Sequence, residues 1–116
     1  MHLPDLTILK KRAEYLATQR GQPAHGRGFT LRARKRAAEG EIRVGFTCSK
    51  KVGNAVARNR AKRRLREAAR MILPAAGQPG WDYVLIGHQG TTATVPFDVL
   101  CQELRDALSK LRDKDR

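Results

Sequence analysis

A long amphipathic segment between residues 54 and 73 leaves this chain few ways to fold. Its apolar side chains Ala61, Leu65, Ala68, Ala69 and Ile72 recur at helical spacing and form one stripe. Asn54 is a favourable N-cap residue. Pro74 predicts the end of the helix, because proline lacks the backbone N–H that a helix interior needs. The spacing therefore predicts one long helix over residues 54–73.

The polar side of this segment is densely cationic. Like charges four residues apart, as in the series Lys62, Arg66 and Arg70, destabilise an isolated helix by about 0.2–0.5 kcal/mol per pair. A partner that supplies anions explains best why the chain tolerates them. Within an arc of roughly 100° the polar side carries Asn59, Lys62, Arg63, Arg66 and Arg70, flanked by Arg58, Arg60 and Arg64.

The net charge of the chain is concentrated in the same part of the sequence. Lys and Arg total 24 and Asp and Glu total 11, which gives +13. Residues 1–70 hold 19 basic and 5 acidic residues (+14), whereas residues 71–116 hold 5 and 6 (−1). Grouped charge of this kind attracts a polyanion, most often a phosphate backbone. A merely solvated face would not need the charge to be grouped.

Apolar periodicity and the positions of glycine and proline predict the remaining elements. We expect a helix over residues 6–20, strands over 29–34 and 42–48, a short buried strand over 83–86 and a closing helix from 97 to 111. A short extra strand can precede Phe29 or follow Val52. The order α-β-β-(β)-α-β-α predicts a single domain, residues 1–116, with an α+β fold: an α/β sandwich in which helices cover a small mixed sheet.

The two alternating strands, 29–34 and 42–48, are expected to pair antiparallel through the turn at residues 35–40. One face of this pair is apolar. The other presents Arg32, Arg34 and Arg43 among small Thr, Gly and Ser residues. A sheet face of this composition predicts a platform for an anionic ligand.

The sequence offers no catalytic or metal-ligating pattern. Cys48 and Cys101 lack zinc spacing, and no GK[ST] phosphate loop is present. His2, His25 and His88 are interpreted as surface or loop residues, because none adjoins a nucleophile motif. The chain also lacks a secretory signal or an apolar stretch that could span a membrane. These features favour a cytoplasmic binding protein with no catalytic residue, no bound metal and no small-molecule substrate.

The segment Lys50-Lys51-Val52-Gly53-Asn54-Ala55-Val56-Ala57-Arg58-Asn59-Arg60, followed by Lys62-Arg63 and Leu65-Arg66-Glu67, closely resembles the signature of the bacterial ribonuclease P protein subunit. Residues 9–15, 82–87 and 96–111 resemble the family's first helix, last strand and closing helix. The resemblance implies the family's fold, in which the crossover around the long helix is left-handed. General rules for connections predict the opposite hand.

The resemblance also implies a function. The family's protein assists a catalytic RNA, which holds Mg²⁺ and removes the 5′ leader from precursor tRNA, by binding the leader and stabilising the active RNA fold. The protein alone needs no cofactor. The residues implied to face the catalytic RNA are Lys50, Lys51, Gly53, Asn54, Arg58, Asn59, Arg60, Lys62, Arg63, Arg66 and Arg70.

The resemblance places a leader-binding cleft between the first helix and the open sheet face. Phe29 shares a strand face with Leu31, so core packing and cleft lining are both open for it. Gln19 and Arg32 stand where relatives often carry aromatic residues, which predicts that the leader is held more by charge than by stacking. The expected cleft residues are Lys11, Arg12, Tyr15, Phe29, Arg32, Arg34 and Arg43.

Three other functions remain open from the sequence. A ribosomal or general structured-RNA-binding protein would share the charge and the fold but not the detailed match over residues 50–67. An independent nuclease would need catalytic groups that the sequence does not show. A DNA-binding helix would need polar base-reading side chains, and only Asn59 qualifies among cations that suit phosphates.

Overall fold

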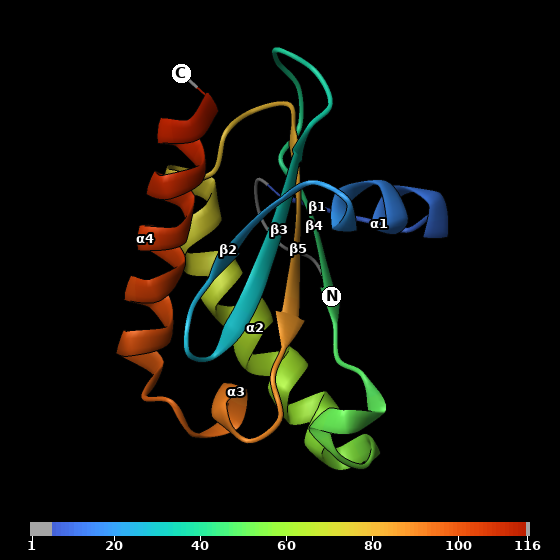
Figure 1. Ribbon diagram of the computed structural model, residues 1–116, viewed down its shortest axis with the longest axis vertical. Helices are drawn as coiled ribbons and strands as arrows, with labels where there is room; N and C mark the ends of the chain where they lie inside the picture. The colour runs from blue at the N-terminus through green and yellow to red at the C-terminus, as the bar shows by residue number, and fades with distance from the viewer. Residues whose placement is uncertain (1–5, 116) are drawn as a thin grey trace.

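The computed structural model describes residues 6–115, apart from the side chains of Lys50 and Asp115. Its helices and strands follow the predicted order, with short strands added at both ends of the first helix and a short helix added before the last one (Figure 1). None of the helices in this part of the chain has the length and apolar character needed to cross a membrane. The elements are β1 (Thr7–Ile8), α1 (Arg12–Gln19), β2 (Gln22–His25), β3 (Phe29–Lys35), β4 (Arg43–Thr47), the 3-10 turn η1 (Lys50–Val52), α2 (Ala55–Ala76), β5 (Trp81–Gly87), α3 (Thr91–Thr94) and α4 (Phe97–Asp115).

The five strands form one mixed sheet in the order β1-β4-β5-β3-β2. β5 is parallel to β4 and antiparallel to β3, so the expected direct pairing of β3 with β4 is wrong. The reason is that β5 is apolar and buried along nearly its whole length, and such a strand needs a neighbour on each side. The predicted extra strand before Phe29 is confirmed as β2.

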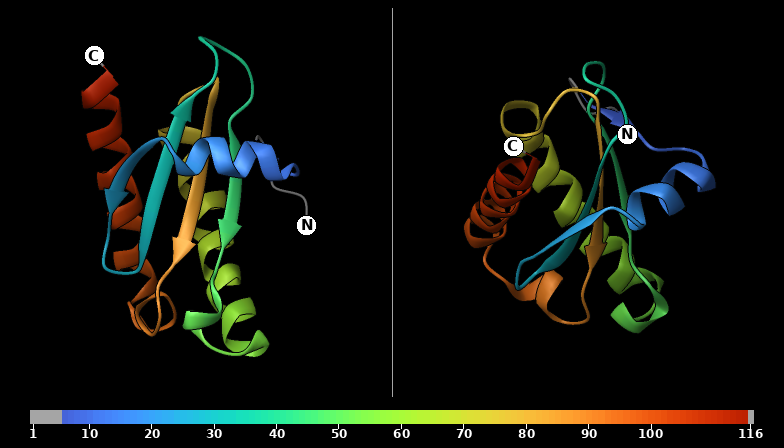
Figure 2. Two further views of the ribbon diagram at one scale, coloured as in Figure 1. Left: turned by 45° about the vertical axis from the view of Figure 1, so that its right-hand side comes forward. Right: turned by 45° about the horizontal axis from the view of Figure 1, so that its top comes forward.

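The connection from β4 through α2 to β5 has the hand that the family resemblance implied. In the left view of Figure 2, α2 lies behind the sheet, β4 and β5 run downwards, and β5 lies to the left of β4. This arrangement is a left-handed crossover, whereas about 98% of such connections are right-handed.

The two faces of the sheet have different covers. α2 and α4 pack on the inner face and enclose the core, while α1 lies across part of the outer face (Figure 2). The core joins the inner side chains of β3, β4 and β5 to the predicted apolar stripe of α2 and to Leu100, Leu104, Leu108 and Leu111 of α4. The cationic side of α2 is consequently directed away from the core.

The first helix is shorter than predicted, and a different side of it faces the sheet. Leu6 and Leu9 are buried, but they flank β1 rather than belonging to α1. Leu16 of α1, expected in an apolar stripe, is 39% exposed, whereas Tyr15 and Thr18 face the sheet. The prediction failed because the outer sheet face is largely polar, so α1 needs no apolar stripe to cover it.

α2 begins and ends at residues that explain its length. The Asn54 side chain accepts a hydrogen bond from the Ala57 N–H at 2.9 Å, which confirms the predicted N-cap. The helix continues past Pro74 to Ala76, so the predicted end at residue 73 is wrong. Pro74 removes only one bond of the last turn, and the Gly77 N–H closes that turn on the Leu73 carbonyl at 2.8 Å.

Candidate nucleic-acid interface

The outer sheet face is organised as rows of side chains that lie opposite one another on neighbouring strands. The strand register defines three rows, with outer-facing residues two apart along each strand. The first holds Arg43, Asp82 and Arg34, the second holds Gly45, Val84, Arg32 and Pro23, and the third, which we name the open row, holds Thr47, Ile86, Thr30 and His25.

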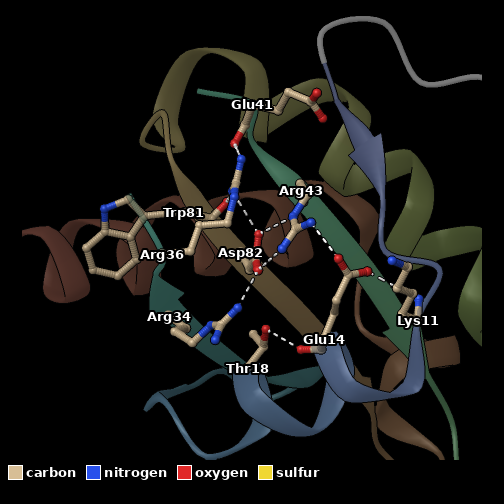
Figure 3. A network of polar contacts seen from close by, with 9 residues as sticks. All are labelled: Lys11, Glu14, Thr18, Arg34, Arg36, Glu41, Arg43, Trp81 and Asp82. Atoms are coloured by element: carbon tan, nitrogen blue, oxygen red, sulfur yellow. Dashed lines mark hydrogen bonds and ion pairs between the residues drawn. The ribbon is translucent and has the colours of Figure 1, made fainter. Parts of the chain in front are cut away.

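Asp82 is the centre of the first row (Figure 3). Its fully buried carboxylate accepts two hydrogen bonds from Arg43, both at 2.7 Å, one from Arg36 at 2.9 Å and one from Arg34 at 3.3 Å. Burial by itself raises the pKa of Asp82, but the hydrogen bonds and charges of the arginines outweigh it and lower the pKa below its ordinary value. Asp82 is therefore a buried anion that holds three cations.

Glu14 connects this network to α1. Its carboxylate accepts hydrogen bonds from Arg43 at 2.6 Å and from the backbone N–H of Lys11 at 3.2 Å (Figure 3). The backbone bond from Lys11 is the main reason that the pKa of Glu14 lies below its ordinary value. Arg34 and Arg43 are thus engaged in internal ion pairs, and their contact with an anionic ligand stays a prediction.

The second row lies beneath α1. The Tyr15 ring rests on Gly45, where an added Cβ would come within 2.5 Å of the ring. Val84 is fully buried, and Arg32 directs its guanidinium to the Gly21 carbonyl at 3.4 Å. Glycine at position 45 is therefore what allows the helix to approach the sheet this closely.

A groove follows the edge of α1 and leads to the open row. It encloses about 340 Å³, and Thr47, the first member of the open row, forms part of its wall. The open row then crosses four strands, a distance of roughly 14 Å at about 4.8 Å per strand spacing. Groove and row together form an uncovered strip that an extended chain could follow. The groove is lined by Lys10, Arg12, Tyr15, Leu16, Gln19 and Thr47.

The structure separates the residues predicted for the cleft. Arg12 and Tyr15 line the groove, whereas exposed Lys11 lines a neighbouring hollow of about 210 Å³ with Glu14 and Arg43. Phe29 is only 1% exposed and belongs to the core, so core packing is confirmed for it and cleft lining is wrong. The reason is the strand register, which turns Phe29 with Leu31 and Ala33 to the inner face.

The cationic side of α2 adjoins the β4 edge of this strip. The Arg66 guanidinium lies 5.8 Å from the centre of the Phe46 ring. The charges of Arg58 and Lys62 act on the thiol of Cys48, which lies just beyond β4. Arg58 Nε is buried and finds no hydrogen-bond partner among the described residues. The α2 cations and the groove therefore reach neighbouring residues of β4, Phe46 on the inner face and Thr47 on the outer face.

The other α2 residues predicted to bind RNA differ in their exposure and in their hydrogen bonds within the protein. Asn59, Arg60 and Arg63 are exposed or nearly so, and Arg70 forms an ion pair with Glu67. Asn54 uses its side-chain oxygen for the N-cap. Lys51 is exposed, while the side chain of Lys50 lies outside the described part of the chain.

Arg64, which flanks the cationic side of α2, has a structural role. Its guanidinium donates to the carbonyl oxygens of Thr92 at 2.9 Å and Val95 at 2.6 Å. These bonds tie the α3 segment to α2. Arg64 therefore holds the α3 segment against α2 and contributes less to the exposed charge than its neighbours do.

The sequence did not predict the role of several residues on this surface. Asp82, Glu14 and Arg36 form the ion network, and His25 and His88 meet at Thr30. No local pattern predicts these contacts, because they depend on the order and register of β2, β3, β4 and β5 in the sheet. Among the described residues, no three His, Cys, Asp or Glu side chains gather where they could hold a metal ion.

Comparisons with known proteins agree on one family. The family model described as Ribonuclease P matches residues 3–112. The ribonuclease P protein component of Ruegeria pomeroyi is 60% identical over 108 residues, covering 91% of this chain and 86% of the relative. The component of the same name from Caulobacter vibrioides is 45% identical over 111 residues, covering 93% and 73%.

Solved structures show the same likeness. The RNase P protein from Thermotoga maritima superposes with a TM-score of 0.74 at 25% identity, covering 88% of this chain and 94% of that one. The Staphylococcus aureus RNase P protein superposes with a TM-score of 0.68 at 25% identity, covering 90% and 94%. Sequence, fold and the cationic surface together show that the chain belongs to the ribonuclease P protein family.

Proposed function

We propose that this chain is the RNA-binding subunit that assists ribonuclease P RNA in removing the 5′ leader from precursor tRNA. One observation carries the proposal: the cations of α2 and the uncovered strip adjoin at β4. A catalytic RNA bound along α2 would then lie beside a precursor leader bound in the strip. The protein contributes affinity and orientation at the site of cleavage.

The RNA would carry out the hydrolysis, with Mg²⁺ held by the RNA. The side chains of this surface support a binding role for the protein and a catalytic role for the RNA. Its carboxylates are occupied by cations, Asp82 by three arginines, Glu14 by Arg43 and Glu67 by Arg70. Carboxylates engaged in this way serve the architecture of the site, and the exposed cations are left to meet phosphate.

We further propose that the protein works in the cytoplasm. Its two cysteines, Cys48 and Cys101, are buried free thiols. Burial raises the pKa of each thiol, which keeps both in the unreactive protonated form at neutral pH. Two unpaired thiols in a small domain are typical of a reducing compartment.

A reconstitution assay at low Mg²⁺ tests the proposed function. Precursor tRNA is incubated with a bacterial ribonuclease P RNA, with and without this protein, and the 5′ ends of the products are mapped. We expect accurate leader removal only when RNA and protein are both present.

Two outcomes would contradict the proposal. Cleavage by the protein alone would assign catalysis to the protein. Failure to rescue the RNA, together with equal affinity for bulk ribosomal RNA, would instead favour a general structured-RNA-binding protein.

A further inference from the structure

Two histidines far apart in the sequence meet at one hydroxyl group on the outer sheet face. His88 Nε2 lies 2.7 Å from Thr30 Oγ1, and His25 Nδ1 lies 3.4 Å from the same oxygen. His25 ends β2, Thr30 lies in β3 and His88 follows β5. The strand register therefore gathers two imidazoles and a hydroxyl at the far end of the open row. We name these three residues the His–Thr–His cluster.

The cluster is accessible to solvent, and hydrogen bonds of the neighbouring backbone hold His88 in position. His25 is exposed, and Thr30 and His88 are half-buried. The backbone N–H of His88 donates to Thr92 Oγ1 at 2.6 Å, and the buried Thr92 hydroxyl in turn donates to the Gly28 carbonyl at 2.6 Å. These bonds hold the start of the β5–α3 connection against the β2–β3 turn. His88 consequently has a defined place on the sheet face.

The hydrogen-bonding capacity of the cluster suits an anion. A hydroxyl group has one proton to donate and can accept two hydrogen bonds. When both imidazoles carry an extra proton, each can donate to the Thr30 oxygen, and the Thr30 O–H is then free to donate outwards. The cluster in that state presents two positive charges and a directed donor, which are the features that recognise a phosphate oxygen.

The charged side chains on the surrounding elements are largely occupied. Arg27 of the β2–β3 turn pairs with Glu103 of α4, and Arg64 of α2 binds backbone carbonyls. Arg32, in the next row of β3, directs its guanidinium to the Gly21 carbonyl. The imidazoles are therefore the groups best placed to respond to a phosphate at this end of the row.

We propose that the His–Thr–His cluster is a proton-linked contact for a phosphate of the precursor tRNA leader, at the opposite end of the strip from Tyr15. This inference rests on the proposed function and adds a second contact point to it. Histidine side chains change charge between about pH 5 and 8, and a bound phosphate favours the protonated form. Leader binding would then take up protons and tighten as the pH falls from 8 to 6.

The test measures the affinity of the reconstituted holoenzyme for precursor tRNA and for mature tRNA at pH 6 and pH 8. The variant is the double substitution His25→Gln with His88→Gln, which keeps polar side chains but cannot gain a charge. A second variant, Thr30→Val, removes only the bridging hydroxyl. The matched control is Lys110→Gln, which removes an exposed cation of α4. Thermal unfolding of each protein checks that it is folded.

We expect the double variant to lose roughly threefold to tenfold in precursor affinity at pH 6, as for the loss of two exposed ion pairs, and to lose little at pH 8. Thr30→Val should show a smaller loss with the same pH dependence. Mature tRNA, and precursors with leaders too short to reach the cluster, should be unaffected by either variant. The Lys110→Gln control should show no pH-dependent change.

Outcomes that overturn the inference differ from those that overturn the proposed function. If the wild type prefers precursor over mature tRNA but the double variant behaves identically at both pH values, the cluster is not a leader contact. If added Zn²⁺ is needed for the effect and a chelator abolishes it, the cluster binds metal rather than phosphate. If the wild-type holoenzyme shows no preference for precursor, the proposed function itself fails.

Discussion

At the scale of single residues, Asp82 determines which arginines of the outer sheet face are free. Three guanidinium groups converge on its buried carboxylate, and one of them also binds Glu14 of α1. The outer sheet face is therefore positively charged, and ion pairs within the protein hold its arginines in place. Arg43 holds α1 in place through Glu14, and the cations of α2 and of the groove are the ones we expect to meet RNA.

Replacing Asp82 by Asn should destabilise the protein by about 2–3 kcal/mol. This value lies below the usual cost of breaking a buried ion pair, because the arginines are partly exposed and can be solvated. Urea unfolding at neutral pH measures the loss. A change below about 0.5 kcal/mol would show that the network does not brace the sheet.

The same substitution should alter the acid sensitivity of the protein. The pKa of Asp82 is lowered in the folded state, so its stabilising contribution is present above the ordinary Asp pKa of about 3.9 and is lost as the pH falls through the folded value. The free energy of unfolding of the wild type should therefore fall more steeply below about pH 4 than that of Asp82→Asn. Parallel acid profiles for the two proteins would contradict this assignment.

Among the α2 residues, Arg66 is the one whose substitution should reduce RNA affinity most clearly. Arg66→Ala should weaken binding to ribonuclease P RNA and reduce the slope of log affinity against log salt by about one, as for the loss of one phosphate contact. Filter binding over a range of salt concentrations measures the slope. Arg105→Ala, on the exposed side of α4, is the control and should leave it unchanged. An unaltered slope for Arg66→Ala would argue against RNA along α2.

At the scale of elements, the sequence predicted most helices and strands but not how they pair. The α2 stripe, its N-cap and the apolar run of β5 are local patterns, and the structure confirms them. The β3–β4 pairing was wrong because no local pattern shows that a strand from later in the chain inserts between them. The side of α1 that faces the sheet was wrong for the same reason, since it depends on a polar network that β5 completes.

A substitution at Gly45 tests whether the close packing of α1 on β4 is needed to bind precursor tRNA. In Gly45→Ala the new methyl group would meet the Tyr15 ring, so the ring must move away from its place in the groove. Precursor tRNA affinity of the holoenzyme should fall by roughly tenfold, within the range found for aromatic stacking on bases. Affinity for ribonuclease P RNA alone should not change, because α2 is untouched. Equal losses in both measurements would indicate a general folding defect.

At the scale of the whole molecule, the sandwich places the two proposed binding surfaces on either side of β4. The left-handed crossover brings α2 behind β4 (Figure 2), and the guanidinium of Arg66 on this helix lies 5.8 Å from the centre of the Phe46 ring of β4. The charge distribution and the central motif predicted an RNA-binding protein of this family. The strip itself could not be predicted, because its residues come from four strands and meet only through the sheet register.

The composition of the strip predicts weak preference for leader sequence. Tyr15 is the aromatic residue of the groove, where Gln19 occupies the next helical turn and Lys10 and Arg12 supply charge. Precursors with leaders of equal length and different base composition should bind with affinities within roughly fivefold of one another, because charge does not distinguish bases. A strong preference for one base would show that stacking or base contacts dominate.

The most direct test of the proposed arrangement is photo-crosslinking from the leader within the reconstituted holoenzyme. A photoreactive uridine in the leader of precursor tRNA is activated, and the attached peptides are identified by mass spectrometry, with mature tRNA as the control. We expect crosslinks within residues 10–19, which line the groove, and at the open-row residues Thr47, Ile86, Thr30 and His25, and none with mature tRNA. Crosslinks confined to the exposed side of α4, in a holoenzyme that still cleaves the leader, would contradict the placement of the leader in the strip.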